Sequence, residues 1–600
     1  LKGLKIKSDI GINLGQNEYN SYTPVYQLST LDLNTRSTAT QSMRRDFSYN
    51  WENTVSYSKV LGQHSIELMA GSTVNEYSAY WVGGSKQELV IDDFNHAIID
   101  NAKFDSTRNV YGAKADDALL SYFGRINYNF NEEVPLTFTY RRDGSTRFGP
   151  ANRWGNFFSA SAGWIISQRE FFKNSLGNVI DYCKIRVSWG QNGNDRIPAF
   201  AYLSLIDFNN KYYYFGDQEA QSVGAAPSMI ENAKLRWESA EQWNLGADFR
   251  ILKDFSLAFD WYDKRQKGWL IRKPVLLVVG VLSDSEYPIV NGGDVRNRGV
   301  ELELGYTKSV GELQISVKAN VAKNKNEVID IPTEEGIIHG QSSVLYNGSE
   351  EFYRAQTGYP LGYFYGYKTN GIFQNADEIQ SYVGVDSAGN TILGSNGKPV
   401  LIQPKAQPGD VRFVDLNKDG KIDEKDKTMI GNPYPDYTYG LNFNMAYKGF
   451  DFGFTLQGVY GNDIVYGVRV MDREYANWDS EMLNRWRGEG TSNRIPRAYA
   501  GIDPNLNWKR ISDLYINDGS YMKVRNITVG YDFGRLIKGP IKQCRLYFTV
   551  ANAFVFTSYK GLDPEVGYGA TSTYESMSSG IDLGTYPQPR QYMLGLNLKF

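Results

Sequence analysis

The chain has 600 residues and a formal net charge of −3, with 43 Tyr, 30 Phe, 12 Trp and 59 Gly against only 20 Pro. A charge this close to neutral provides no basic field, which excludes nucleic acid as a partner. The two Cys and three His are scattered along the chain, which excludes a zinc cluster. No run reaches the roughly 18 apolar residues of a membrane helix.

Strand-like segments recur in pairs that are joined by short turns. In chain order the pairs are 55–57 with 66–68, 121–130 with 136–140, 245–249 with 257–259, 300–306 with 313–319, 441–447 with 450–456, and 527–531 with 546–550. Long stretches separate them at 15–43, 77–118, 192–232, 265–297, 323–436, 461–520 and 556–589. Short turns at one end and long loops at the other are typical of outer-membrane barrels. We therefore predict an all-β fold, a transmembrane antiparallel β-barrel of roughly 16 strands with short periplasmic turns and long extracellular loops.

Alternation within a strand predicts which side chains face lipid. In the segment 313–321, Leu313, Ile315, Val317, Ala319 and Val321 alternate with Gln314, Ser316, Lys318 and Asn320. Successive side chains of a strand point to opposite faces of the sheet. We expect the apolar set to face lipid and the polar set to face the barrel lumen.

The last nine residues repeat this pattern. Tyr592, Leu594, Leu596, Leu598 and Phe600 share one predicted face, opposite Met593, Gly595, Asn597 and Lys599. A soluble protein rarely leaves an apolar strand exposed, since its edge recruits other chains, whereas a membrane barrel has no such problem. The segment is predicted to be the closing strand of a barrel, running toward the periplasm.

The sharpest local motif is the run 415–426 within the long extracellular loop 323–436. Its spacing fits a calcium-binding loop, with Gly420 at the sharp turn and Ile422 packed inward. The predicted ligands are Asp415, Asn417, Asp419, the Lys421 carbonyl, Asp423 and Asp426. No flanking helices are evident, so an Asx-rich turn without metal is the alternative. We expect calcium, if bound, to be structural.

Two aromatic clusters fall in or beside the predicted loops. Tyr212, Tyr213 and Tyr214 precede Phe215, and Tyr363 and Tyr365 lie in the run 363–367. Aromatic rings can stack on a ligand while their hydroxyls form hydrogen bonds, so these tyrosines are candidate substrate contacts. Packing within the loops is the alternative. The apolar run 275–282 is either a surface for a partner or a simple hairpin above the membrane.

No catalytic set is visible in the sequence. It has no nucleophile-elbow pattern and no metal-ligating pair of histidines. The acidic residues are too many and too dispersed for a glycosidase pair to be singled out. We therefore predict that the chain is not an enzyme.

Several segments carry a resemblance to a known family. They are 141–149 with 153–155, 161–164, 235–238, 297–301, 371–373, 518–521, 526–528 and 559–565, and they follow one another through nearly the whole chain. Together they resemble the SusC/RagA class of TonB-dependent outer-membrane transporters.

The resemblance implies a parent barrel of about 22 strands with a plugged lumen, of which residues 1–600 are the C-terminal part. The plug, the TonB-contacting segment and the leading domain of the family are not recognised here, and Leu1 is expected to mark a cut. The terminal residues 592–600 resemble a barrel-assembly signal.

The resemblance also implies a function and a location. It implies TonB-dependent import of oligosaccharides or peptides with a SusD-like lipoprotein, in the outer membrane of a Gram-negative bacterium. Its partners would be that lipoprotein, membrane lipid, and TonB through the missing N-terminal part. The alternatives are a non-transporting receptor or adhesin, and a secreted glycan-binding protein or glycosidase.

Overall fold

The computed structural model describes residues 2–30, 32–103, 105–208, 212–214, 221–227, 229–273, 275, 287–468, 477–499, 501–537, 539–567 and 577–600. Most of the predicted apolar run 275–282 therefore lies outside the described residues. The chain divides into two compact units. Unit 1 comprises Leu1–Trp164, Val187–Glu241 and Gly268–Asn291, and unit 2 comprises Ile165–Arg186, Gln242–Lys267 and Gly292–Phe600.

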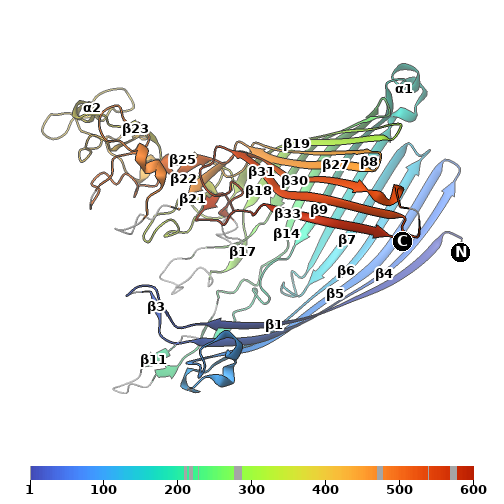
Figure 1. Cartoon of the computed structure of the whole chain (residues 1–600), viewed down its shortest axis with the longest axis horizontal. Helices are drawn as coiled ribbons and strands as arrows, with labels where there is room; N and C mark the ends of the chain where they lie inside the picture. The colour runs from blue at the N-terminus through green and yellow to red at the C-terminus, as the bar shows by residue number, and fades with distance from the viewer. Residues whose placement is uncertain are drawn as a thin grey trace. The chain divides into compact units, whose positions relative to one another are not determined.

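One sheet of 16 strands dominates the fold, and neighbouring strands in it follow the order of the chain (Figure 1). Its strands are β1 (Leu4–Thr23), β4 (Thr38–Leu61), β5 (His64–Gln87), β6 (Asn109–Phe130), β7 (Val134–Ser145), β8 (Trp154–Ile165), β9 (Ile180–Asn194), β14 (Glu238–Ile251), β15 (Phe255–Lys267), β18 (Asp294–Val310), β19 (Leu313–Asp330), β26 (Tyr437–Tyr447), β27 (Phe450–Tyr460), β30 (Tyr521–Asp532), β31 (Gln543–Thr557) and β33 (Gln591–Lys599). The predicted all-β fold and the strand count are confirmed.

The six predicted hairpins are all present. Their connections are 62–63, 131–133, 252–254, 311–312, 448–449 and 533–542. At the turn between β26 and β27, Lys448 and Gly449 both have positive φ, at 50° and 89°. A two-residue turn of this kind matches the twist of the strands that it joins. A seventh connection, 166–179 between β8 and β9, carries the short helix α1 (Glu170–Ser175), which the sequence did not predict.

Several strands extend further than predicted. Parts of the expected loops 15–43, 77–118 and 323–436 belong to β1, β4, β5, β6 and β19, and β19 continues to Asp330. In 322–330 the strand carries polar residues on both faces, as in Lys323-Asn324-Lys325-Asn326. Where a strand extends beyond the lipid, neither of its faces needs to be apolar. The alternation of apolar and polar residues by which a strand is recognised in the sequence is then lost. The loop boundary at 323 was therefore wrong by about eight residues.

The long connections contain further small elements. Beside the main sheet lie β2 (Tyr26–Gln27), β3 (Leu33–Asn34), β10 (Ile206–Asp207), β11 (Tyr212–Tyr214), β12 (Gln221–Val223), β13 (Ala226–Pro227), β16 (Leu270–Arg272), β17 (Ile289–Asn291), β20 (Ile337–His339), β21 (Tyr353–Gln356), β22 (Tyr363–Tyr367), β23 (Thr369–Ile372), α2 (Ala376–Ser381), β24 (Val411–Phe413), β25 (Lys427–Gly431), β28 (Asp463–Tyr466), β29 (Ile516–Asp518) and β32 (Ile581–Asp582). Short 3₁₀ turns lie at Phe94–His96, Ile99–Asn101, Asp105–Thr107, Ile166–Gln168, Glu424–Asp426, Ser480–Asn484, Asp513–Tyr515 and Phe533–Arg535. None of the helices in the described part of the chain combines the length and the apolar character that crossing a bilayer would require.

Three connections of unit 2 fold together into what we call the loop module, residues 331–436, 461–520 and 558–590 as far as they are described. It holds a four-stranded sheet in the order β20-β21-β22-β25, a β23-β24 pair and a three-stranded sheet in the order β29-β28-β32. In Figure 1, β21, β22, β23, β25 and α2 gather beyond one end of β19, β30 and β31. The predicted loop 323–436 is thus mostly a folded body.

Candidate functional site

The sheet of unit 2 has one polar face. Gln314, Ser316 and Lys318 of β19 lie opposite Ala446, Asn444 and Asn442 of β26 in the strand register. Together with side chains of β27, β30 and β31, they line a cavity of about 720 Å³. The predicted polar set of this strand therefore does share one face with polar neighbours.

An ion pair lies on the same face. The guanidinium of Arg545 donates to both carboxylate oxygens of Asp451, at 2.8 and 2.5 Å. Paired hydrogen bonds of this geometry are among the stronger polar contacts in proteins. Polar side chains, including this ion pair, therefore form one part of the cavity wall, and Ile315, Met445, Phe452 and Phe454 form an apolar part.

The opposite face carries the apolar side chains. Ile315, Val317, Ala319 and Val321 lie opposite Met445, Phe443, Leu441 and Tyr439. On the adjoining strand Leu304 is 49% exposed. Since apolar side chains line this surface on successive strands, it forms a continuous band that is suited to contact with hydrocarbon.

The terminal strand β33 joins this band. Its even-numbered residues pair with Val550, Phe548, Leu546 and Cys544 of β31. Tyr592, Leu594, Leu596, Leu598 and Phe600 are between 46% and 74% exposed. The predicted two-faced character of the segment is confirmed, whereas its role as an assembly signal stays a prediction.

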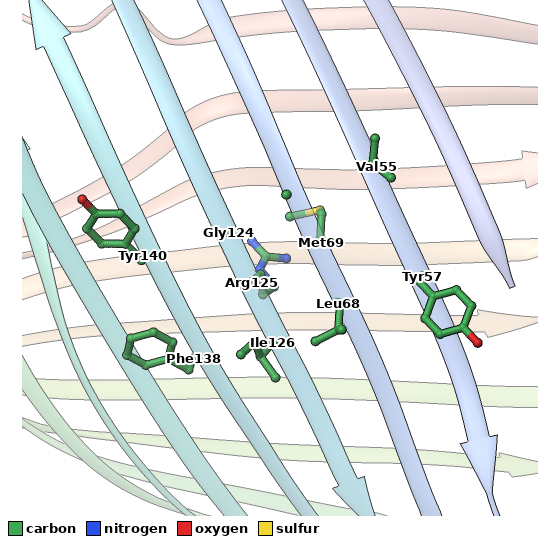
Figure 2. A pocket seen from close by; sticks show the side chains of 10 residues that line it. Val55, Tyr57, Leu68, Met69, Gly124, Arg125, Ile126, Phe138 and Tyr140 are labelled. Carbon is green, nitrogen blue, oxygen red and sulfur yellow. The ribbon is translucent and has the colours of Figure 1, made fainter.

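Unit 1 repeats the apolar face on its own strands. Figure 2 shows side chains of β4, β5, β6 and β7 around an apolar hollow of about 370 Å³. Ala70 and Gly124 are paired in the register, and these two small residues line the hollow together with the larger Leu68, Ile126 and Phe138.

The predicted calcium loop has the expected backbone. Gly420 has φ of +86°, and Ile422 packs with Tyr367 and Phe413. Asp415 accepts backbone N–H groups from residues 419 and 420, and the buried Asp426 accepts from residues 416, 417 and 423. These hydrogen bonds alone can order the loop.

The remaining predicted ligands do not converge. The Asn417 amide donates to Asp419, and the Lys421 ammonium lies 2.5 Å from Asp423 and 3.8 Å from Asp419. Among the residues that the structure describes, no three His, Cys, Asp or Glu side chains are grouped so as to hold a metal. Asp415 and Asp426 retain free lone pairs. Calcium binding by the loop stays a prediction.

The predicted substrate tyrosines have different surroundings. Tyr363 is 1% exposed, donates to Gln356 at 2.6 Å and stacks on Tyr359. Tyr365 lies beneath the guanidinium of Arg354, 3.4 Å from the ring centroid. Packing therefore accounts for both rings in this structure. Tyr212, Tyr213 and Tyr214 form β11, which pairs with β12, and their side chains lie outside the described part. Substrate contact by all five stays a prediction.

A buried polar network joins two connections within the loop module. Asn507 donates to Asp410 at 3.0 Å and accepts the backbone N–H of Val411. Asn505 donates to Asn507 and accepts from Gln403. Burial raises the pKa of Asp410, although the hydrogen bonds from Asn507 and Tyr499 oppose this shift. The network links residues about 100 positions apart, a separation that no local sequence pattern reveals.

A second network ties the segment 559–565 to the sheet. The Lys523 ammonium on β30 is 2% exposed and lies 2.6 Å from Asp563 and 2.8 Å from Glu565. Arg525 also pairs with Glu565, and Tyr521 donates to it. The segment that carries a family resemblance thus has a structural task, which is to anchor the last connection on β30.

The comparisons with known proteins agree with this architecture. Residues 4–553 match the family model described as TonB dependent receptor-like, beta-barrel. The chain belongs to this family. As a TonB-dependent receptor β-barrel of the SusC/RagA type, it is an outer-membrane protein of a Gram-negative bacterium. The prediction that it is not an enzyme agrees with the family.

Two curated relatives cover nearly all of the chain. It is 28% identical to TonB-dependent receptor P3 of Formosa agariphila, over 100% of this chain and 57% of the relative. It is 29% identical to TonB-dependent receptor SusC of Bacteroides thetaiotaomicron, over 91% of this chain and 49% of the relative. The chain thus spans about half the length of the curated relatives that it matches.

A solved structure has the same fold. The RagAB peptide transporter aligns with a TM-score of 0.78 and 21% identity, over 100% of this chain and 60% of that one. The family membership accounts for the polar and apolar faces of the sheet, because a barrel presents them to its lumen and to lipid.

Proposed function

We propose that the protein to which this chain belongs imports nutrients across the outer membrane, with oligosaccharides as the favoured cargo and peptides as the alternative. The observation that carries this proposal is the similarity to SusC, which runs through 91% of the chain. The cavity against β19, β26 and β27 supports it, because polar side chains line part of it and a hydrated cargo needs a polar path through a membrane.

A SusD-like lipoprotein is the proposed partner outside the cell, and TonB the proposed source of energy. The loop module supports the assignment of a lipoprotein partner. A folded body offers a partner a surface that is already ordered, whereas separate loops would lose conformational entropy on binding. TonB would act through parts of the protein that precede this barrel.

Uptake by cells tests the proposal directly. Cells that carry the full-length gene would be given fluorescently labelled oligosaccharides and, separately, labelled peptides. Uptake that is lost on deletion of the gene, of the partner gene or of tonB supports import. The labelled compound that enters the cells shows whether the cargo is an oligosaccharide or a peptide. Labelled cargo that binds to cells but never enters, with or without tonB, would instead support a non-transporting receptor or adhesin.

We further propose that the loop 415–426 binds calcium as a structural ion. Its support is the spacing of oxygen-bearing residues, the turn at Gly420 and the lone pairs that Asp415 and Asp426 retain. The Lys421 side chain would have to leave Asp423 and Asp419 for those carboxylates to join.

A further inference from the structure

A small cavity of about 300 Å³ lies within the loop module, next to the predicted calcium loop, whose Ile422 carbonyl accepts a hydrogen bond from Arg510. None of the predicted calcium ligands or predicted substrate tyrosines is among the residues that line it. Its lining includes Tyr346, Glu350, Tyr367, Leu506, Lys509 and Arg510. These residues come from two of the connections, 331–436 and 461–520, which the module brings together. The volume is at the small end of the range for ligand pockets and suits one terminal group or one small residue of a ligand.

Arg510 is the unusual member of this set. Its guanidinium lies over the rings of Tyr367 and Phe413, with its central carbon 5.8 and 5.2 Å from their centroids. Among the described residues, its one side-chain hydrogen bond runs to the Ile422 carbonyl at 3.5 Å, the long limit of such a bond. A guanidinium carries five N–H donors in a planar fork, so most of this capacity is unused.

The nearby carboxylates are committed elsewhere. Glu350 and Glu424 both pair with the buried ammonium of Lys427. Asp426 accepts three backbone N–H groups, and Asp503 accepts those of residues 505, 506 and 507. In the described part of the chain, Arg510 therefore has aromatic faces around it and no carboxylate partner within 4 Å.

The charges around the cavity leave a positive excess. Lys509 contributes a second cation, and its backbone carbonyl accepts a hydrogen bond from the Tyr346 hydroxyl at 2.6 Å. Burial lowers the pKa of Arg510, although Glu350, Asp503 and Asp426 oppose the shift. A partly buried cation without an ion pair is costly, and an anion that binds there offsets that cost.

We propose that this cavity binds a carboxylate group, with the Arg510 fork as its bidentate donor and Lys509 as a second positive charge. The planar guanidinium matches a carboxylate in geometry, and the rings of Tyr346 and Tyr367 border the space for the rest of the ligand. A sugar acid and a peptide C-terminus both present this group. The site does not require that its occupant be transported.

Binding to the full-length protein in detergent tests the site without any transport step. Glucuronate and N-acetylalanine serve as carboxylate probes, and glucose and N-acetylalanine amide as their neutral counterparts, in ligand-observed NMR titrations. We expect at least one acid to bind and its neutral counterpart to bind roughly tenfold or more weakly, since the bidentate charged contact is lost. Binding of glucuronate alone assigns a sugar acid, binding of N-acetylalanine alone a peptide terminus, and binding of both the carboxylate itself.

Variants locate the binding. Arg510→Gln should weaken the acid roughly tenfold or more and Arg510→Lys should restore only part of the affinity, since it keeps the charge but loses the fork. Arg487→Gln is the matched control, because Arg487 is an exposed arginine of the same connection. Leu506→Trp, which fills the cavity and keeps both cations, should also block the acid if Arg510→Gln fails to fold. Equal affinity in Arg510→Gln or in Leu506→Trp, or equal binding of acid and neutral probes, would overturn the site.

Discussion

The sheet and the loop module place their apolar side chains in opposite ways. On β33, Tyr592 and Leu594 are 65% and 74% exposed, whereas in the module Phe364 and Phe413 are fully buried. The sheet is stabilised by its backbone ladder and presents its apolar side chains to lipid. The module is packed like a soluble domain, with an aromatic core and buried polar networks. The medium that surrounds each region therefore decides whether its apolar side chains are exposed or buried.

The largest expected effect comes from the core of the module. Phe413→Ala removes a ring that packs with Tyr367, Val411 and Ile422, and should destabilise the module by about 3–5 kcal/mol. Hydrogen exchange should then speed up in the module and stay slow in β19, β26 and β27. Tyr586→Ala is the control, because that ring is 84% exposed. Equal acceleration in the strands would mean that the two regions are not separate in stability.

The sheet is tested by a charge on its apolar face. Val317→Arg should cost up to about 2–4 kcal/mol, since arginine is placed in hydrocarbon. Ser316→Arg, one residue away on the polar face, should be tolerated. The fraction of folded, heat-modifiable protein in outer membranes measures both. If the two variants assemble equally well, the assignment of the faces is wrong.

The anchor between the two regions should respond to acid. Burial acts to raise the pKa of Asp563, but hydrogen bonds from Lys523 and the backbone of Glu565 outweigh it, so the pKa is lowered. The stability that it contributes is therefore present above the unfolded value of about 3.9 and is lost as the pH falls through the lower folded value.

Protonation of Asp563 should release the connection that follows β31, at a cost of about 1.5–3 kcal/mol. Proteolysis of residues 558–567 as a function of pH measures the release. In Asp563→Asn, cleavage should already be raised at neutral pH and should change little with acid. An unchanged pH profile in the variant would assign the transition to another group.

The smallest effect is expected at the predicted calcium loop. Asp415→Ala with Asp419→Ala should loosen the loop within 323–436 and leave the barrel folded, because its neighbours are held by the core of the module. Limited proteolysis with calcium and with a chelator measures the difference. Equal cleavage of the unaltered protein in both conditions would contradict the proposal that calcium orders this loop.

The sequence predicts the sheet better than the module, for a physical reason. In 313–321 the two media on either side impose alternation, so hairpins, facing and the strand count can be read from the residues. In 322–330 lipid no longer dictates one face: polar residues occur on both faces, and distant segments of the module cover Asn326 and Val328, so the strand is not visible in the sequence. The terminal segment 592–600 is legible because lipid again dictates one face.

The candidate site was less accessible to sequence reasoning. Tyr363 has the composition of a ligand contact but lies buried, because distant segments cover it. Arg510 and Lys523 were missed, since their surroundings depend on residues far along the chain. The one local hint was the cationic pair Lys509-Arg510 beside Trp508, which is too common a pattern to predict a site.

The module also has an unusual attachment. Its three connections join β19 to β26, β27 to β30 and β31 to β33, so six strand ends enter it. A body on one tether can swing as a whole, but one fixed at six points loses its rotational freedom unless the strands themselves bend. Any motion of this region that accompanies ligand capture should therefore be a local rearrangement of short segments, and not a rigid-body rotation of the module about a hinge.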